Sequence, residues 1–161
     1  MRKPLPAIVV SLVVAATASG KDCDVVVYGG TPAGVAAAIE AGKSGAKVLL
    51  VEPNRWVGGM PANGLCHPDF RTFEALSGFY LDLTRRVEKY YLEKYGPDSQ
   101  QFKDSRKGTH AEPHVNRLVM ERMLGKQKSV EVLLRHRVAG ATAVGSGDAR
   151  RVVSATFAGP N

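Results

Sequence analysis

The sequence has little cysteine, and its cysteines follow no metal-binding pattern. Cys23 and Cys66 are the two cysteines among 161 residues, and no C-x-x-C pair occurs. A disulfide-dense scaffold and a zinc module are therefore excluded, and no metal site is expected. In an oxidising compartment the two cysteines could pair, but neither their spacing nor their flanking residues require a disulfide.

Long hydrophobic runs are also scarce. The clearest one covers residues 8–16, is broken once by serine and follows a basic start. It is shorter than the roughly 20 residues of a membrane-spanning helix, and Ala-Thr-Ala at residues 16–18 has the small-x-small form of a cleavage site. This layout predicts a secretory signal peptide over residues 1–18 and a secreted or periplasmic mature chain, 19–161, that is free of the membrane. The alternative is an uncleaved anchor.

A clustered excess of basic residues is missing too, although the formal net charge is +7. The lysines and arginines are scattered, whereas a nucleic-acid surface needs a basic stripe with stacking aromatics. The sequence therefore predicts no nucleic-acid partner. Hydrophobic residues make up 44% of the chain. At this chain length they suffice for one globular domain with a core.

The first third of the mature chain predicts a strand, a helix and a second strand. Residues 24–28 form a short β-branched run that ends at Gly29-Gly30, which is typical of a buried parallel strand. Residues 32–44 are rich in alanine and stop at Gly45, as a helix does. Residues 47–51 repeat the strand pattern. The result is a βαβ unit with a parallel sheet, which places the chain in the α/β class.

The middle of the chain predicts a helical insertion around residues 74–125. From Leu76 the apolar residues recur every three or four positions up to Gly96-Pro97, which indicates an amphipathic helix and its stop. Residues 98–111 are polar and irregular, and a further helix is expected from Pro113, which suits a first turn.

The last third predicts strands. Residues 130–134 form one, and residues 138–144 and 152–157 flank the turn residues 145–148 as a β-hairpin or meander. No further element follows before residue 161. The expected fold is thus a Rossmann-like βαβ domain plus a hairpin, incomplete at its C-terminus.

The turn between the first strand and its helix contains the motif that indicates a function. Gly29-Gly30-Thr31-Pro32-Ala33-Gly34 occupies the position of the dinucleotide fingerprint G-x-G-x-x-G. Amides at the start of the helix, together with the helix dipole, favour a diphosphate there. Thr31 replaces the middle glycine, so it must hold an ordinary negative φ, and its hydroxyl could donate to a phosphate oxygen.

Two further features support a dinucleotide. Glu52 ends the second strand 18 residues after Gly34, close to the spacing of a ribose-binding carboxylate. Such an acid disfavours a 2′-phosphate, although Arg55 weakens that inference. The long loop over residues 53–73 is of a length that is usually functional or disordered, and it contains a second glycine pair, Gly58-Gly59, followed by Met60. An ordinary glycine turn in an unrelated α/β protein is the competing interpretation.

These motifs resemble the FAD-dependent oxidoreductases with a glutathione-reductase-type Rossmann domain, and more narrowly the bacterial exported, xanthan-lyase-like group. The segments that carry the resemblance are DVVVYGGTPAG (24–34), VLLVE (48–52), GGM (58–60), EPHV (112–115) and the terminal hairpin. The resemblance implies that residues 29–34 bind the diphosphate of FAD, that Glu52 binds its ribose and that residues 58–60 lie beside the cofactor. It also implies that the main chain of Val138 contacts the adenine. It also implies a small-molecule or saccharide substrate. Such proteins carry a later glycine–acid motif and a substrate domain, so the chain resembles an N-terminal fragment that is inactive alone.

No residue is identified as catalytic. His67 could face a flavin, but a water-exposed loop histidine is the favoured interpretation, and Cys66 is expected to be inert. His114 is expected to cap its helix or contact the core, whereas Trp56 either shields a cofactor or covers its loop. The function expected is the FAD-binding portion of a secreted flavin-dependent oxidoreductase. The alternatives are a fragment of an NAD-binding dehydrogenase and a non-catalytic secreted remnant without cofactor.

Overall fold

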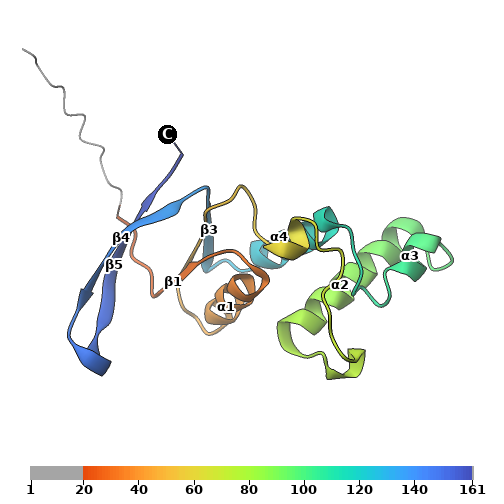
Figure 1. Ribbon diagram of the computed structural model, residues 1–161, viewed down its shortest axis with the longest axis horizontal. Helices are drawn as coiled ribbons and strands as arrows, with labels where there is room; N and C mark the ends of the chain where they lie inside the picture. Colours follow the sequence, from red (N-terminus) through yellow and green to blue (C-terminus); the bar gives the residue numbers. More distant parts are fainter. Residues whose placement is uncertain (1–19, 161) are drawn as a thin grey trace, which may run out of the picture.

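The computed structural model describes residues 20–160 (Figure 1). The predicted signal peptide, residues 1–18, lies outside the described residues. The described chain contains a parallel sheet in the order β1-β2-β3, four α-helices and an antiparallel hairpin. The elements are β1 (Val25–Tyr28), α1 (Pro32–Lys43), β2 (Val48–Glu52), α2 (Gly78–Tyr95), α3 (Gln100–Asp104), α4 (Pro113–Gly125), β3 (Val130–Leu134), β4 (Arg137–Val144) and β5 (Arg151–Ala158).

The three-stranded sheet forms the centre of the fold. All five residues of β2 are buried, as expected of a parallel strand that is covered on both faces. Val27 of β1 and Val132 of β3 flank Leu50 of β2 in register. The alanine-rich helix α1 packs on this face and ends before Gly45, whose φ of +90° suits a helix stop. The predicted βαβ unit is confirmed.

The helical layer extends the core away from the sheet. Val87 of α2 and Val115, Val119 and Met120 of α4 are buried in one cluster with α1. Figure 1 shows α2 and α3 at the end of the molecule that lies opposite the hairpin. The prediction that residues 98–111 are irregular was wrong in part, because they contain α3, which the Ser99 hydroxyl caps at the Phe102 amide.

The hairpin of β4 and β5 is mostly exposed and projects from one end of the sheet (Figure 1). The open end of the hairpin, where the start of β4 pairs with the end of β5, lies against β1, and Phe157 stacks there on Tyr28 with ring centroids 6.2 Å apart. The fold class is therefore the predicted one, α/β with a parallel sheet and a terminal antiparallel hairpin. In the described part of the chain no helix is both long and apolar enough to cross a bilayer.

Candidate dinucleotide-binding site

The turn between β1 and α1 needs glycine at two positions for different reasons. Gly29 has a φ of +107°, a conformation that side chains disfavour, and its N–H donates to the Val51 carbonyl at 2.7 Å. A Cβ on Gly34 would lie 1.8 Å from the Gly29 carbonyl oxygen. The two fingerprint glycines thus allow the chain to reverse tightly and the helix to start against the strand.

Thr31 caps α1 without the backbone angle of a glycine. Its φ is −64°, as predicted, and its Oγ1 accepts a hydrogen bond from the Gly34 N–H at 3.2 Å. The hydroxyl hydrogen stays available to a further acceptor. Between residues 20 and 160 no acceptor is assigned to the N–H groups of Thr31 and Ala33. Two amides and one hydroxyl at the positive end of a helix dipole suit an anionic oxygen group.

Glu52 connects this turn to the loop that follows β2. Its side chain is 5% exposed. Its Oε2 accepts from the Gly30 N–H at 2.6 Å, and its Oε1 accepts from both the N–H and the Nδ2 of Asn54, each at 2.7 Å. A carboxylate oxygen can accept about two hydrogen bonds, so Oε2 retains an acceptor position for a ribose hydroxyl. The contact with Gly30 was not predicted, although Glu52 ends β2 and Gly30 follows the end of the neighbouring parallel strand β1.

The second glycine pair lies directly against the first. The Gly58 N–H donates to the Gly30 carbonyl at 2.6 Å. Gly59 has a φ of +53°, and a Cβ there would lie 3.2 Å from Cδ of Pro32. Met60, which starts the 3-10 turn Met60–Ala62, is 73% exposed. The structure therefore brings Gly58 and Gly59 to the start of α1, the position at which the sequence predicts a cofactor.

The start of β4 lies at the same end of the sheet. The N–H of Arg135 donates to the Asn54 carbonyl at 3.0 Å, and that of His136 donates to the Glu52 carbonyl at 3.2 Å. The Val138 N–H reaches Tyr28 Oη at 3.4 Å, and the side chain of Val138 is 49% exposed. Val138 thus lies beside the carboxyl ends of β1 and β2, where ligands of open parallel sheets bind.

Trp56 belongs to the same loop after β2, and its ring contacts Arg117 of α4. Its Nε1–H donates to Asn63 Oδ1 at 2.8 Å. Two guanidinium carbons lie over its ring, that of Arg55 at 3.8 Å and that of Arg117 at 4.9 Å from the ring centroid. Arg117 was not predicted, because no sequence pattern relates residues so far apart in the chain.

Among residues 20–160 the histidines and cysteines form no metal centre. The rings of His67 and His110 stack, with centroids 4.5 Å apart and an interplanar angle of 2°. Desolvation lowers the pKa of His110, and electrostatic interactions with His67 and Arg106 lower it further. His114 is exposed, and the N-cap residue of α4 is Glu112, so His114 makes neither the expected cap nor the expected core contact. Cys23 and Cys66 are free, and the described residues contain no group of three or more metal-ligating side chains.

Comparison with known proteins identifies the family. A model of the family "FAD dependent oxidoreductase" matches residues 24–160. The mitochondrial dihydrolipoyl dehydrogenase of Dictyostelium discoideum is 37% identical over 86 residues, which cover 50% of this chain and 17% of that protein.

Two solved structures share the fold. Thermovibrio ammonificans THI4 has a TM-score of 0.50 at 16% identity over 84% of this chain and 47% of its own. The 3-ketosteroid-delta4-(5alpha)-dehydrogenase from Rhodococcus jostii RHA1 has a TM-score of 0.50 at 16% identity over 91% of this chain and 44% of its own. The chain thus spans less than half the length of these proteins. The family match covers most of the chain, and the glycine turn and Glu52 fit a dinucleotide: the chain belongs to the FAD-dependent oxidoreductase family, has its FAD-binding fold, and is by that membership expected to bind FAD.

Proposed function

We propose that this chain is the FAD-binding portion of a secreted or periplasmic oxidoreductase of the glutathione-reductase type, from the bacterial exported, xanthan-lyase-like group. The family match supports the flavin. The basic start, apolar run and small-x-small site within residues 1–18 support export. A small-molecule or saccharide substrate is proposed from the resemblance alone.

In this proposal the main chain of residues 29–34 holds the diphosphate of FAD, and Glu52 accepts from the adenosine ribose. Residues 58–60 lie beside the cofactor, and the main chain of Val138 contacts adenine. The observation that carries the proposal is the double attachment of Gly30, whose N–H donates to Glu52 while its carbonyl accepts from Gly58. Bound FAD supplies electron transfer, and the chain supplies binding and orientation.

Binding of FAD by the chain itself is tested by its thermal unfolding with excess FAD, ADP or NAD. A ligand that binds the folded state raises the melting temperature. We expect FAD and ADP to raise it in the wild type and not in Gly34→Ala, since the added Cβ meets the Gly29 carbonyl. Gly125→Ala is the matched control, because a Cβ there meets nothing within 4 Å.

The alternatives give different results in the same experiment. Stabilisation by NAD without stabilisation by FAD or ADP would identify an NAD-binding fragment. No effect of any dinucleotide on a folded chain would identify a remnant that holds no cofactor. Export is tested separately, by mass spectrometry of the protein recovered from bacterial periplasm or medium, where an N-terminus at Ser19 is expected.

A further inference from the structure

Two arginines from distant parts of the chain share one tryptophan. Arg55 comes from the loop after β2 and Arg117 from the second turn of α4, and their guanidinium groups lie 3.8 Å and 4.9 Å from the ring centroid of Trp56. The Trp56 ring is itself fixed by its hydrogen bond to Asn63. Stacking on an aromatic face orients a guanidinium group and leaves the N–H donors at its rim free.

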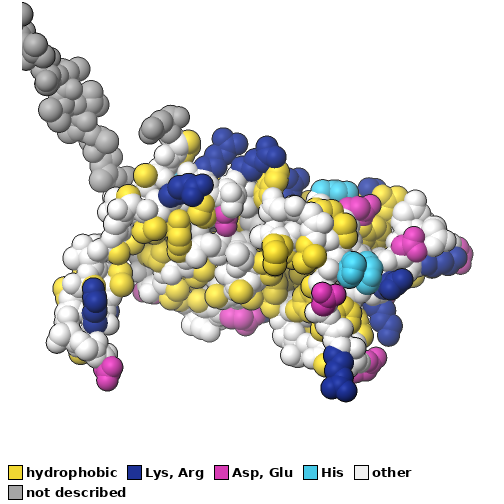
Figure 2. Space-filling model, viewed as in Figure 1, with side chains coloured by type: hydrophobic (Ala, Val, Ile, Leu, Met, Phe, Trp, Pro, Cys, Tyr) yellow, Lys and Arg dark blue, Asp and Glu magenta, His cyan; other side chains and the backbone are white. Residues whose placement is uncertain are grey.

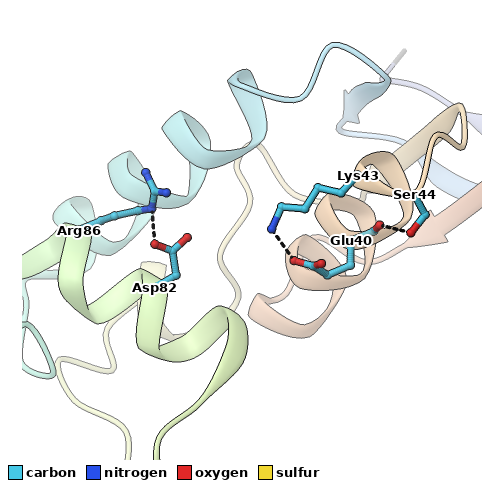
Figure 3. A network of polar contacts seen from close by, with 5 residues as sticks. All are labelled: Glu40, Lys43, Ser44, Asp82 and Arg86. Atoms are coloured by element: carbon cyan, nitrogen blue, oxygen red, sulfur yellow. Dashed lines mark hydrogen bonds and ion pairs between the residues drawn. The ribbon is translucent and has the colours of Figure 1, made fainter.

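Within residues 20–160 no acidic partner is assigned to Arg55, and the one assigned to Arg117 is Glu121, at a long distance. No ion pair or hydrogen bond is assigned to the Arg55 side chain there. The Nε of Arg117 lies 3.8 Å from Glu121 Oε1, too far for a hydrogen bond, and this buried nitrogen has no other partner. Figure 3 shows the contrasting case of Arg86, whose Nε donates to Asp82 at 2.9 Å.

Arg55 is exposed to water, whereas the Nε of Arg117 is buried and makes no hydrogen bond, which costs free energy. We propose that Arg55 and Arg117, held by Trp56, bind an anionic oxygen group such as a phosphate or a carboxylate. A guanidinium group offers parallel N–H donors that match such groups, and its hydrogen bonds to them are charge-assisted.

In this proposal the site is distinct from the diphosphate position on the glycine turn, to which it is linked by Asn63, whose Oδ1 accepts from Trp56 and whose Nδ2 donates to the Gly59 carbonyl at 2.6 Å. The loop after β2 contacts the start of α1 through Gly58 and Gly59, whereas Trp56 contacts α4 through Arg117. Figure 2 shows Lys and Arg side chains gathered at the top of the view, over this loop and the neighbouring end of β3. Their field adds to the attraction of an anion.

The site contains its own reporter, because Trp56 is the one tryptophan of the sequence. We therefore titrate the purified chain with inorganic phosphate, and with chloride at matched ionic strength, and follow tryptophan fluorescence. Phosphate is expected to change the Trp56 emission in a saturable way, and chloride is not. Equal effects of the two salts would overturn the proposal, because they would reduce it to screening.

Substitutions of the two arginines test whether phosphate binds at this site. Arg117→Gln and Arg55→Gln are each expected to weaken phosphate binding at least about tenfold, since each removes charge-assisted bonds. Arg117→Lys keeps the charge but not the parallel donors, so it is expected to fall between wild type and Arg117→Gln, and circular dichroism verifies folding. The control Arg122→Gln removes an exposed charge from the same helix. Equal loss in Arg122→Gln would overturn the proposal.

A second ligand distinguishes the source of the anion. ADP carries the diphosphate of the cofactor without the flavin, which would itself quench tryptophan. With ADP saturating, phosphate is expected still to change the Trp56 emission in the wild type. A phosphate response that disappears completely as ADP saturates would overturn a separate site, because the anion would then be the diphosphate of the nucleotide itself.

Discussion

Glu52→Gln tests whether Glu52 holds the binding turn together before any ligand arrives. The carboxylate accepts three hydrogen bonds in a site that is 5% exposed, one from Gly30 on Oε2 and two from Asn54 on Oε1. Glutamine keeps the shape but has one acceptor oxygen, and its NH₂ group donates. In one orientation the NH₂ group faces the buried N–H of Gly30, and in the other it faces the two donors of Asn54, which are partly buried.

The magnitude follows from the bonds that are lost. With the NH₂ group toward Gly30, one charge-assisted bond disappears, which is worth about 1.5–3 kcal/mol, and a buried N–H is left without a partner. With the opposite orientation both Asn54 donors are unsatisfied. We therefore expect the free energy of unfolding to fall by about 2–4 kcal/mol, a large part of the roughly 5–15 kcal/mol of an ordinary domain.

Urea unfolding followed by circular dichroism measures this loss. The matched control is Glu131→Gln, since Glu131 is exposed and pairs with Lys21 at the surface, where such pairs contribute about 0–1 kcal/mol. If the free energy of unfolding falls by the same amount in the two variants, to within about 0.5 kcal/mol, Glu52 does not hold the binding turn together. ADP binding should also weaken in Glu52→Gln and not in Glu131→Gln.

Three further outcomes are expected. Gly34→Ala lowers the melting temperature, with a loss of about 1–3 kcal/mol from overpacking against the Gly29 carbonyl; a neutral result in thermal unfolding would contradict the close approach. Thr31→Ala costs about 1 kcal/mol through the lost cap and Thr31→Ser far less, and urea midpoints that coincide would contradict a capping role. Because the folded pKa of His110 lies below its ordinary 6.5, the unfolded chain binds the proton first, and stability falls as the pH drops through 6.5 toward the lower folded value. Urea midpoints at several pH values, with His110→Asn as the reference that lacks this slope, measure the effect.

The parallel sheet and its helix were predictable because their signals are local. The β-branched runs of β1 and β2, the alanines of α1 and the stop at Gly45 depend on neighbours a few residues away. The short helix α3 was not predictable from periodicity, since five residues cannot show an apolar stripe. A serine cap decides its position instead.

For the candidate site, too, only the features with local signals were predictable. The fingerprint glycines and Glu52 have a fixed spacing, because the βαβ unit fixes the distance between two strand ends. The contact of Gly58 with Gly30 and the stacking of Arg117 on Trp56 depend on how a long loop folds back and on where α4 packs. Tertiary packing determines both contacts, and no local pattern in the sequence encodes them.

The loop after β2 should couple the two proposed binding positions. On one side the Gly58 N–H bonds to Gly30, and on the other the Asn116 Nδ2 donates to the Pro61 carbonyl at 3.3 Å, next to the site of Arg117. A ligand that shifts this loop therefore changes both the glycine turn and the surroundings of Arg117. Linkage requires that ADP change the affinity for phosphate by the same factor by which phosphate changes the affinity for ADP. We expect equal factors that differ from one in calorimetric titrations; a factor of one in both directions would show that the loop transmits nothing between them.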